Sequence, residues 1–192
     1  MNEFRIRPAL RSDATLIATA VLQAVGDEIC LEFAGSPDNL KLVTEVFERL
    51  AADDAAQYSY RNSLIAEDSN GQAAGVIIAY DGAELHRLRK RFIEVANAVL
   101  GYDMKDADFI DETDCGEVYL DSIFVLPEYR GQGLAGMLIN AAIDNHKDLG
   151  KPAGLLVDPD NPRARRVYER MGFRQVGHRP FAGVMMEHMQ KG

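Results

Sequence analysis

The stretch from residue 119 to residue 139, YLDSIFVLPEYRGQGLAGMLI, constrains the fold of this chain more than any other. Its first part mixes aromatic and β-branched residues, as strands do, and Pro127 ends that pattern because proline cannot donate to a strand ladder. Apolar residues then recur at helical spacing, at Leu134, Met137, Leu138, Ala141 and Ala142. The pattern predicts a strand, a glycine-rich loop and a helix in direct succession.

Glycine-rich backbone opens the predicted helix. The first N–H groups of a helix have no partner within it, and both these groups and the helix dipole favour an anion. We therefore predict that a phosphate group binds at this helix start. The candidate residues are Arg130, Gly131, Gln132, Gly133, Leu134, Ala135 and Gly136.

Two phosphate-binding patterns fit this loop. In the first, Gly131, Gly133 and Gly136 match the dinucleotide fingerprint, and Asp158 lies about 20 residues further on, where a ribose-binding acid belongs. A dinucleotide domain, however, puts its glycines directly after the first strand, whereas several residues intervene here. Too little chain follows to complete a doubly wound sheet, so a nicotinamide oxidoreductase is the weaker alternative.

The second pattern extends beyond the loop. Val125-x-Pro127-x-x-Arg130-Gly131-x-Gly133-x-Ala135 resembles the pyrophosphate loop of the GNAT N-acetyltransferase superfamily. Asn161-x-x-Ala164-x-x-x-Tyr168-x-x-x-Gly172-Phe173 resembles the second motif of the same superfamily, in the same order and at the customary distance. The resemblance covers the C-terminal part of the chain from about Glu117. The N-terminal half matches only in the broad order of its elements.

This resemblance implies a single α/β domain of the GNAT type over residues 1–192, with a mixed central sheet flanked by helices. Turn and cap signals place its elements. Strands are predicted at residues 4–7, 63–67, 75–80, 153–157, 172–179 and 184–188. Helices are predicted to begin near Ala14 with Asp13 as cap, at Ser36 and Pro37, and at Asn161 and Pro162.

Residues 82–116 are interpreted as an insertion relative to the shortest members of the family. A helix is marked by Leu85, Leu88, Phe92, Val95 and Val99, and its other face carries His86, Arg87, Arg89, Lys90 and Arg91. An acidic loop follows, over residues 103–117. Two interpretations stay open. In the first, the basic helix face and the acidic loop are both solvated and their charges balance. In the second, the basic face contacts cofactor phosphates and the acidic loop forms a lip that attracts a cationic substrate.

The resemblance implies acetyl transfer from acetyl-CoA to a primary amine of a small molecule or peptide, by direct attack in a ternary complex. It implies that the strand backbone at Ile123, Phe124 and Val125 pairs with the pantetheine arm. Asn161 falls on the position of a cofactor-binding residue. Tyr168 follows it by close to two helical turns, so both side chains can face one slot, and Tyr168 is the candidate acid for the departing thiolate.

The general base is less directly indicated. Members with a base on this strand often carry Glu at the position that falls here on Tyr119. Asp121 and Glu117 share the strand face of Tyr119 by the period-two rule, so either can serve, and Asp121 is our candidate. Tyrosines at predicted strand ends, Tyr58, Tyr60 and Tyr80, are read as half-buried strand residues or as pocket residues.

Composition bounds the remaining possibilities. The formal net charge of −9 argues against a nucleic-acid partner, and 47% hydrophobic residues in 192 allow a proper core. Two cysteines indicate a reducing compartment, and the absence of a long apolar run or apolar leader leads us to expect a cytoplasmic protein without a membrane partner. His178 and His188 lack metal-ligand spacing, so no metal is expected. A catalytically silent acyl-CoA-binding module is the alternative function, and a homodimer is left open.

Overall fold

One mixed sheet runs through the molecule, a computed structural model that describes residues 3–192. Its strands are β1 (Arg5–Pro8), β2 (Ser63–Glu67), β3 (Ala73–Asp81), β4 (Val118–Val125), β5 (Ala153–Val157), β6 (Arg174–Phe181) and β7 (Val184–Lys191). The α-helices are α1 (Ala14–Val25), α2 (Asp27–Ala34), α3 (Leu40–Ala51), α4 (Leu85–Leu100), α5 (Leu134–Asn145) and α6 (Pro162–Arg170). The predicted strand, loop and helix of residues 119–139 are therefore β4, its following loop and the start of α5.

The strand order is β1-β2-β3-β4-β5-β7-β6. Neighbouring strands are antiparallel except β4 and β5, which run parallel. This mixed sheet confirms the predicted fold class. The oxidoreductase alternative is wrong, because a doubly wound domain needs a mostly parallel sheet with its glycine loop after the first strand.

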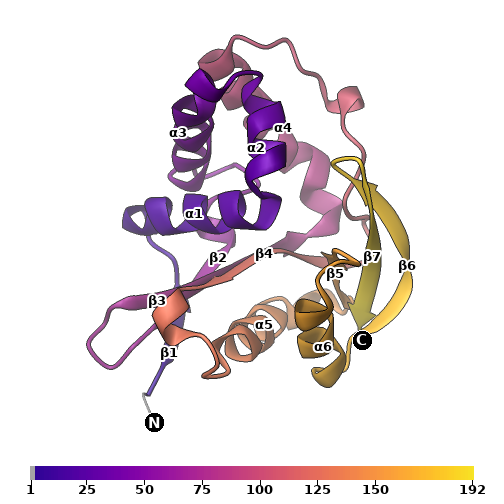
Figure 1. The fold of residues 1–192 in the computed structure, drawn as a ribbon. Helices are drawn as coiled ribbons and strands as arrows, with labels where there is room; N and C mark the ends of the chain where they lie inside the picture. Colours follow the sequence, from indigo (N-terminus) through magenta and orange to yellow (C-terminus); the bar gives the residue numbers. More distant parts are fainter. Residues whose placement is uncertain (1–2) are drawn as a thin grey trace.

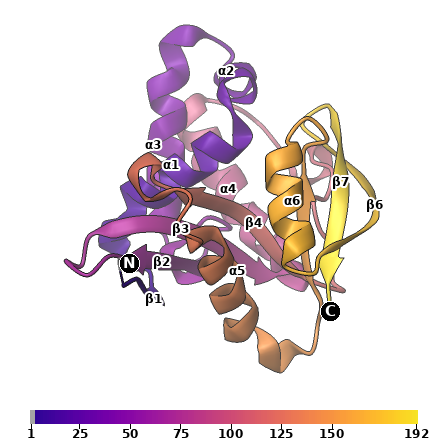
Figure 2. The same cartoon turned by 60° about the horizontal axis from the view of Figure 1, so that its bottom comes forward.

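The helices lie in layers on the two faces of the sheet (Figure 1). Helices α1 to α4 cover one face, and α5 crosses the other face, with α6 beside β7 and β6 (Figure 2). The apolar core is divided accordingly. Val21, Leu50 and Ile78 are fully buried on the side of α1 to α4, while Leu138 and Leu155 are buried on the side of α5.

The helix starts differ in part from the sequence prediction. α1 begins at Ala14 as predicted, but Asp13 does not cap it, because its carboxylate accepts hydrogen bonds from Arg7 at 2.7 Å and from the Leu10 N–H at 2.7 Å. Ser36 accepts from the Asp38 N–H at the short 3₁₀ turn that precedes α3. The sequence prediction missed α2, which is only eight residues long.

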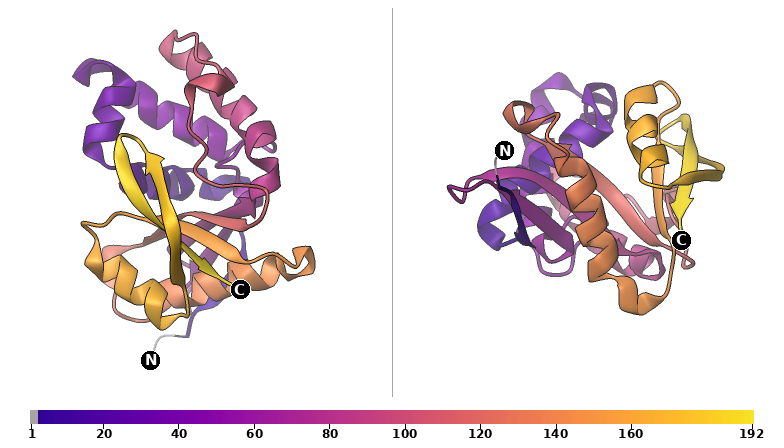
Figure 3. Two further views of the ribbon diagram at one scale, coloured as in Figure 1. Left: turned by 90° about the vertical axis from the view of Figure 1, so that its right-hand side faces the viewer. Right: turned by 90° about the horizontal axis from the view of Figure 1, so that it is seen from below.

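Both β-hairpins have tight turns. Asp68 closes the β2–β3 turn by accepting from the N–H groups of Asn70 and Gln72. β6 begins and ends two residues later than predicted, so the connection between β6 and β7 shrinks to Ala182 and Gly183, with φ angles of 47° and 79°. Positive φ at both positions is the geometry of a type I′ turn. This hairpin rises from the sheet toward the layer of α1 to α4 (Figure 3).

Within residues 3–192, no individual helix combines the length and apolarity that a membrane crossing requires. The segments Arg11–Val25 and Asp27–Ala34 reach that length and composition together, with a bend of 101° between them. The bend falls at Gly26, whose φ is 84°.

Candidate active site

The predicted phosphate loop borders a groove of about 660 Å³ between the end of β4, the start of α5 and α6. Every predicted cofactor residue except Gln132 lines it: Ile123, Phe124, Val125, Arg130, Gly131, Gly133, Leu134, Ala135, Gly136 and Asn161. The Gln132 amide instead reaches back to the Glu128 carbonyl oxygen at 3.5 Å. Residues from three elements are thus brought together along one groove.

The loop conformation depends on two glycines. Gly131 and Gly133 have φ angles of 79° and 83°, which a residue with a Cβ adopts only under strain, although nothing lies within 4 Å of an added Cβ. Gly133 is the N-cap of α5 and no side chain caps that helix, so its first N–H groups are available to a ligand. Arg130 is held against β4, with Nε donating to the Val125 carbonyl at 3.0 Å.

Arginines of α6 supply positive charge to the groove. Arg163, Arg166 and Arg170 line it, whereas Arg165 turns away to Glu169, at 2.9 Å, and to Glu187. Helix α4 lies on the opposite face of the sheet from α5 (Figure 1). The helix over residues 85–100 therefore does not contact the predicted phosphate site.

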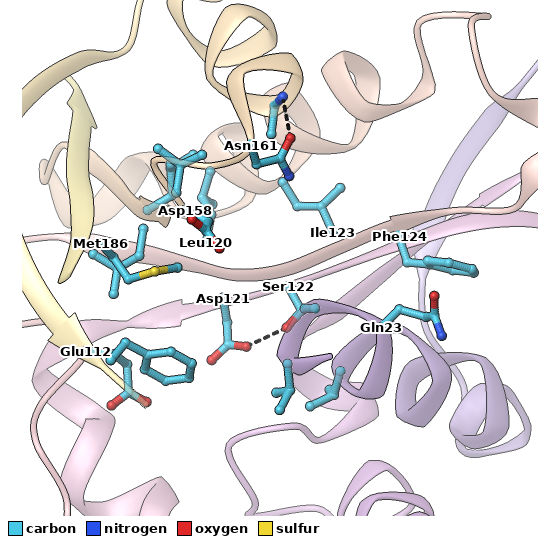
Figure 4. Close-up of a pocket in the computed structure, with 18 of the residues that line it drawn as sticks. Gln23, Glu112, Leu120, Asp121, Ser122, Ile123, Phe124, Asp158, Asn161 and Met186 are labelled. Atoms are coloured by element: carbon cyan, nitrogen blue, oxygen red, sulfur yellow. Dashed lines mark hydrogen bonds between the residues drawn. The ribbon is translucent and has the colours of Figure 1, made fainter. Parts of the chain in front are cut away.

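β4 and β5 pair only at Val118 with Ala153 and at Tyr119 with Gly154, and then separate. A cavity of about 370 Å³ lies at this divergence. Asp121, Ile123 and Asn161 are among the residues that line it (Figure 4). Tyr168 lines both this cavity and the groove, so the groove leads into the gap between the strands.

A β-bulge interrupts β4 at Asp121. Ser122 pairs with Ile78 and Leu120 pairs with Ala79, which leaves Asp121 as an extra residue without a partner on β3. Strict alternation would put Tyr119 and Ile123 on one face of the sheet. Instead, Tyr119 packs with Tyr80 and Leu88 on the side of α4, and Ile123 packs on the side of α5. The extra residue thus shifts Ile123 to the other face, while Asp121 stays on the side of Tyr119, where Tyr80 and Gln57 donate to it.

Polar groups surround the Asp121 carboxylate. Ser122 donates to it at 2.8 Å, Tyr80 at 3.2 Å, and the Gln57 amide at 3.3 Å. Burial and the nearby charge of Glu112 outweigh these hydrogen bonds and raise the pKa of Asp121 to about 6. A carboxylate with this pKa is ionised at neutral pH yet is a stronger base than an ordinary aspartate.

Tyr168 lies on α6, whose first turn is capped by Asn161 through a 3.1 Å hydrogen bond from the Ala164 N–H (Figure 4). Its ring packs edge-on against Phe173, with 6.0 Å between centroids. Burial raises the pKa of Tyr168, so its hydroxyl stays protonated and can donate a hydrogen bond. Tyr168 and Asp121 border one cavity. Tyr168 contributes a protonated hydrogen-bond donor to this cavity, and Asp121 contributes a carboxylate.

Glu117, the second candidate base, is placed elsewhere. Its side chain is fully buried and accepts hydrogen bonds from Thr113 at 2.7 Å and Gln190 at 2.8 Å, and lies 2.8 Å from His188. The period-two argument fails for Glu117 because β4 begins only at Val118. His188 is buried beside Glu117, a partner that no sequence pattern indicated. Across residues 3–192 no group of three His, Cys, Asp or Glu side chains is arranged to hold a metal ion.

The acidic loop folds back on α4. Arg89 falls on the buried face of α4, not on the exposed basic face predicted for it, and its side chain is 3% exposed. It pairs with Asp111 at 2.7 Å and with Glu112 at 2.6 Å, and the Gln57 amide also lies 2.6 Å from Glu112. Glu112 lines the cavity of Asp121. Gln57 and the role of Arg89 were missed, since polar residues outside a motif carry no sequence signal of their partners.

A mixed sheet split between β4 and β5, with a glycine loop and helix start beside the split, defines an acyl-CoA-dependent acyltransferase fold. The sequence model of the Acetyltransferase (GNAT) family matches residues 28–173. The chain belongs to the GNAT acetyltransferase family, whose co-substrate is acetyl-CoA, and it is an acyltransferase.

Individual relatives agree with this assignment. An acetyltransferase of Agrobacterium fabrum is 31% identical over 106 residues, which cover 53% of this chain and 72% of that protein. The solved structure of an acetyltransferase is 31% identical, covers 97% of this chain and 98% of its own, and has a TM-score of 0.75. An N-acetyltransferase from Staphylococcus aureus Mu50 shares the fold at 24% identity and a TM-score of 0.76, covering 97% of this chain and 100% of its own.

Proposed function

We propose that this protein transfers the acetyl group of acetyl-CoA to a primary amine by direct attack within a ternary complex. The observation that carries the proposal is that Asp121 and Tyr168 border one cavity, which opens into the groove of the glycine loop. A base and a hydrogen-bond donor are the two groups that amine acetylation requires.

The binding part of the proposal rests on the groove. The free N–H groups at the start of α5 and the guanidinium groups of Arg163 and Arg166 suit the pyrophosphate of coenzyme A. The backbone of Ile123 and the N–H of Val125 face the gap where β5 no longer pairs with β4, so they are free to pair with the pantetheine arm, whereas the Val125 carbonyl already accepts from Arg130. In this proposal, the thioester of bound acetyl-CoA lies beside Asp121 and Tyr168.

The chemical steps are assigned to two side chains. Asp121 takes a proton from the ammonium group of the acceptor, directly or through water, which frees the nitrogen lone pair. The nitrogen then forms a bond to the acetyl carbon while the carbon–sulfur bond breaks, and the second proton that the nitrogen loses passes to the departing thiolate, which leaves as the coenzyme A thiol. Tyr168 donates a hydrogen bond to the departing sulfur. Complete proton transfer from tyrosine to a thiolate is uphill by about 2 kcal/mol at reference pKa values, so hydrogen bonding is its main contribution.

The decisive experiment compares binding with turnover. Acetyl-CoA is titrated into the protein by calorimetry, and thiol release is followed in the same sample with a set of primary amines. Acceptor-dependent release supports the proposal. Binding without release from any amine would favour the silent acyl-CoA-binding module, and no binding would contradict the assignment of Arg130 to Gly136.

Tyr168→Phe tests the assigned donor. We expect a 10- to 100-fold lower kcat with an unchanged dissociation constant for coenzyme A, because only the hydroxyl group is removed. Tyr60→Phe is the matched control, since the Tyr60 hydroxyl bonds to Asp54 on the surface and lines neither the groove nor the cavity of Asp121. A full kcat in Tyr168→Phe would contradict the assigned role.

A further inference from the structure

A second cavity, of about 490 Å³, lies within the layer of α1 to α4, outside the predicted cofactor groove. Aromatic rings from several elements line it: Phe33, Phe47, Tyr58, Phe92, Phe109 and Phe181. All of these rings except Phe181 pack on one another, for example Phe47 on Tyr58 at 5.3 Å and Phe33 on Phe92 at 5.8 Å between centroids. The aromatic cavity, as we call it, therefore has a preformed apolar wall.

The aromatic cavity adjoins the cavity of Asp121. Val25, Tyr58, Glu112 and Phe181 line both. The three hollows therefore adjoin in series, which we call the passage: the groove of the glycine loop meets the cavity of Asp121 at Tyr168, and that cavity meets the aromatic cavity at Tyr58 and Glu112. A molecule in the aromatic cavity can extend one end to Asp121 without crossing the cofactor groove.

Charge is distributed unevenly along this passage. Asp121 lies on the side nearest the reacting groups, and this end favours a cation. On the aromatic side, the Glu112 carboxylate is already bound by Arg89 and Gln57 at 2.6 Å each. The other carboxylates that border the aromatic cavity, on Glu32 and Asp108, belong to exposed residues at its rim.

On the basis of the proposed acetyl transfer, we propose that the acceptor is a small primary amine carried by an apolar body. The apolar body fills the aromatic cavity, and the amino group lies at its junction with the cavity of Asp121. A cavity of this volume suits a single small molecule. A polyamine fits less well, because its inner ammonium would lose water among aromatic rings without a free carboxylate beside it.

The first test uses straight-chain primary amines from propylamine to heptylamine, with acetyl-CoA and thiol release as the readout. Each methylene group buried against the rings should raise kcat/KM about fourfold until the aromatic cavity is full. Binding of heptylamine by calorimetry should show a negative heat-capacity change.

The outcomes separate this inference from the proposed function. A flat alkylamine series, with turnover of a polyamine or a peptide amine, would overturn the apolar acceptor and leave acetyl transfer intact. Absence of turnover with every amine would overturn both.

The second test places a carboxylate in the apolar wall. Ile29 is half-buried on α2 and lines the aromatic cavity. Ile29→Asp should lower kcat/KM for heptylamine about tenfold or more, and should raise the ratio of 1,7-diaminoheptane to heptylamine turnover by a similar factor, because the new charge repels the chain and attracts the second ammonium.

Leu31→Asp is the matched control, since it makes the same charge change on the same helix. Leu31 is 43% exposed and lies outside the lining of the aromatic cavity. Thermal unfolding of both variants shows whether each is folded. Equal amine ratios in folded Ile29→Asp and Leu31→Asp would overturn the placement of the acceptor in the aromatic cavity.

Discussion

Asp121 illustrates how a carboxyl group acquires its chemistry from its surroundings. As an unpaired residue of a β-bulge, it lies at a position where the strand can aim a side chain into a cavity. Burial and Glu112 disfavour its charge, and three donors keep the shift moderate. The result is a pKa of about 6, where a base is both ionised at neutral pH and able to accept a proton.

Asp121→Asn should lower kcat by about 10²- to 10⁴-fold, since the proton acceptor is lost. In the unaltered protein, kcat/KM should rise with pH through about 6, as Asp121 ionises. A pH–rate profile checks both expectations. An Asp121→Asn profile that keeps the same rise near pH 6 would exclude Asp121 as the base.

The contribution of Asp121 to stability should change with pH in the opposite direction to kcat/KM. The folded-state pKa of Asp121 lies above its ordinary value of 3.8, so the folded state binds this proton more tightly. The contribution of Asp121 to the free energy of unfolding therefore decreases as the pH rises from about 4 to about 6. Asp121→Asn should be more stable than the unaltered protein at pH 7, by roughly 3 kcal/mol, and lose that advantage at pH 4. Urea unfolding at the two pH values measures this difference.

The buried Glu117 side chain leaves no room for a side chain at Gly154. An added Cβ would lie 1.7 Å from a carboxylate oxygen of Glu117, which is held by Thr113 and Gln190. Gly154→Ala should cost roughly 3 kcal/mol or more, because the buried Glu117 must leave its partners. Gly177→Ala is the control in β6, where an added Cβ meets nothing within 4 Å, and it should change stability by less than about 0.5 kcal/mol. Equal unfolding midpoints would contradict this account.

At the scale of elements, α4 depends on a buried ion pair. Arg89→Ala should destabilise the protein by about 3 to 5 kcal/mol, because it leaves the buried Glu112 without its cation. Arg87→Ala on the same helix should have little effect, since Arg87 is 61% exposed and pairs with Glu84 at the surface. Chemical denaturation of both variants tests the difference. Similar losses of unfolding free energy in the two variants would contradict a dependence of α4 on the buried Arg89 pair.

The sequence predicted most of the elements that carry motifs. β4, the glycine loop and α5 were recognisable because turn, cap and period signals agree with one another within a short segment. The same holds for Asn161, which caps α6 as predicted. These signals are local, so they can be recognised without knowledge of the tertiary structure.

Features that depend on distant partners were not predictable in this way. The bulge at Asp121 becomes visible only when β3 and β4 are paired. Arg89 was assigned to the exposed face of its helix because the sequence does not show Glu112 folding back onto it. Likewise, the aromatic cavity combines rings from α2, α3, α4 and the final hairpin, whose sequence positions carry no shared pattern.

At the scale of the whole molecule, coenzyme A should stabilise the fold because it binds only the folded state. A free concentration of one hundred times its dissociation constant should add about 2.7 kcal/mol to the free energy of unfolding, which raises Tm by about 5 to 10 °C. NADH at the same concentration is the control and should leave Tm unchanged. An equal shift with both nucleotides would contradict a specific site at Arg130 to Gly136.

The separation of β4 from β5 has a consequence for aggregation. Unpaired strand edges attract strands of other chains, and proteins usually shorten, charge or cover them. Here the unpaired edge of β4 lies inside the molecule, beside α6 and next to a cavity too small for another folded chain. The unpaired edge of β4 is thus accessible to a narrow, extended ligand, whereas strands of other copies of the protein cannot pair with it.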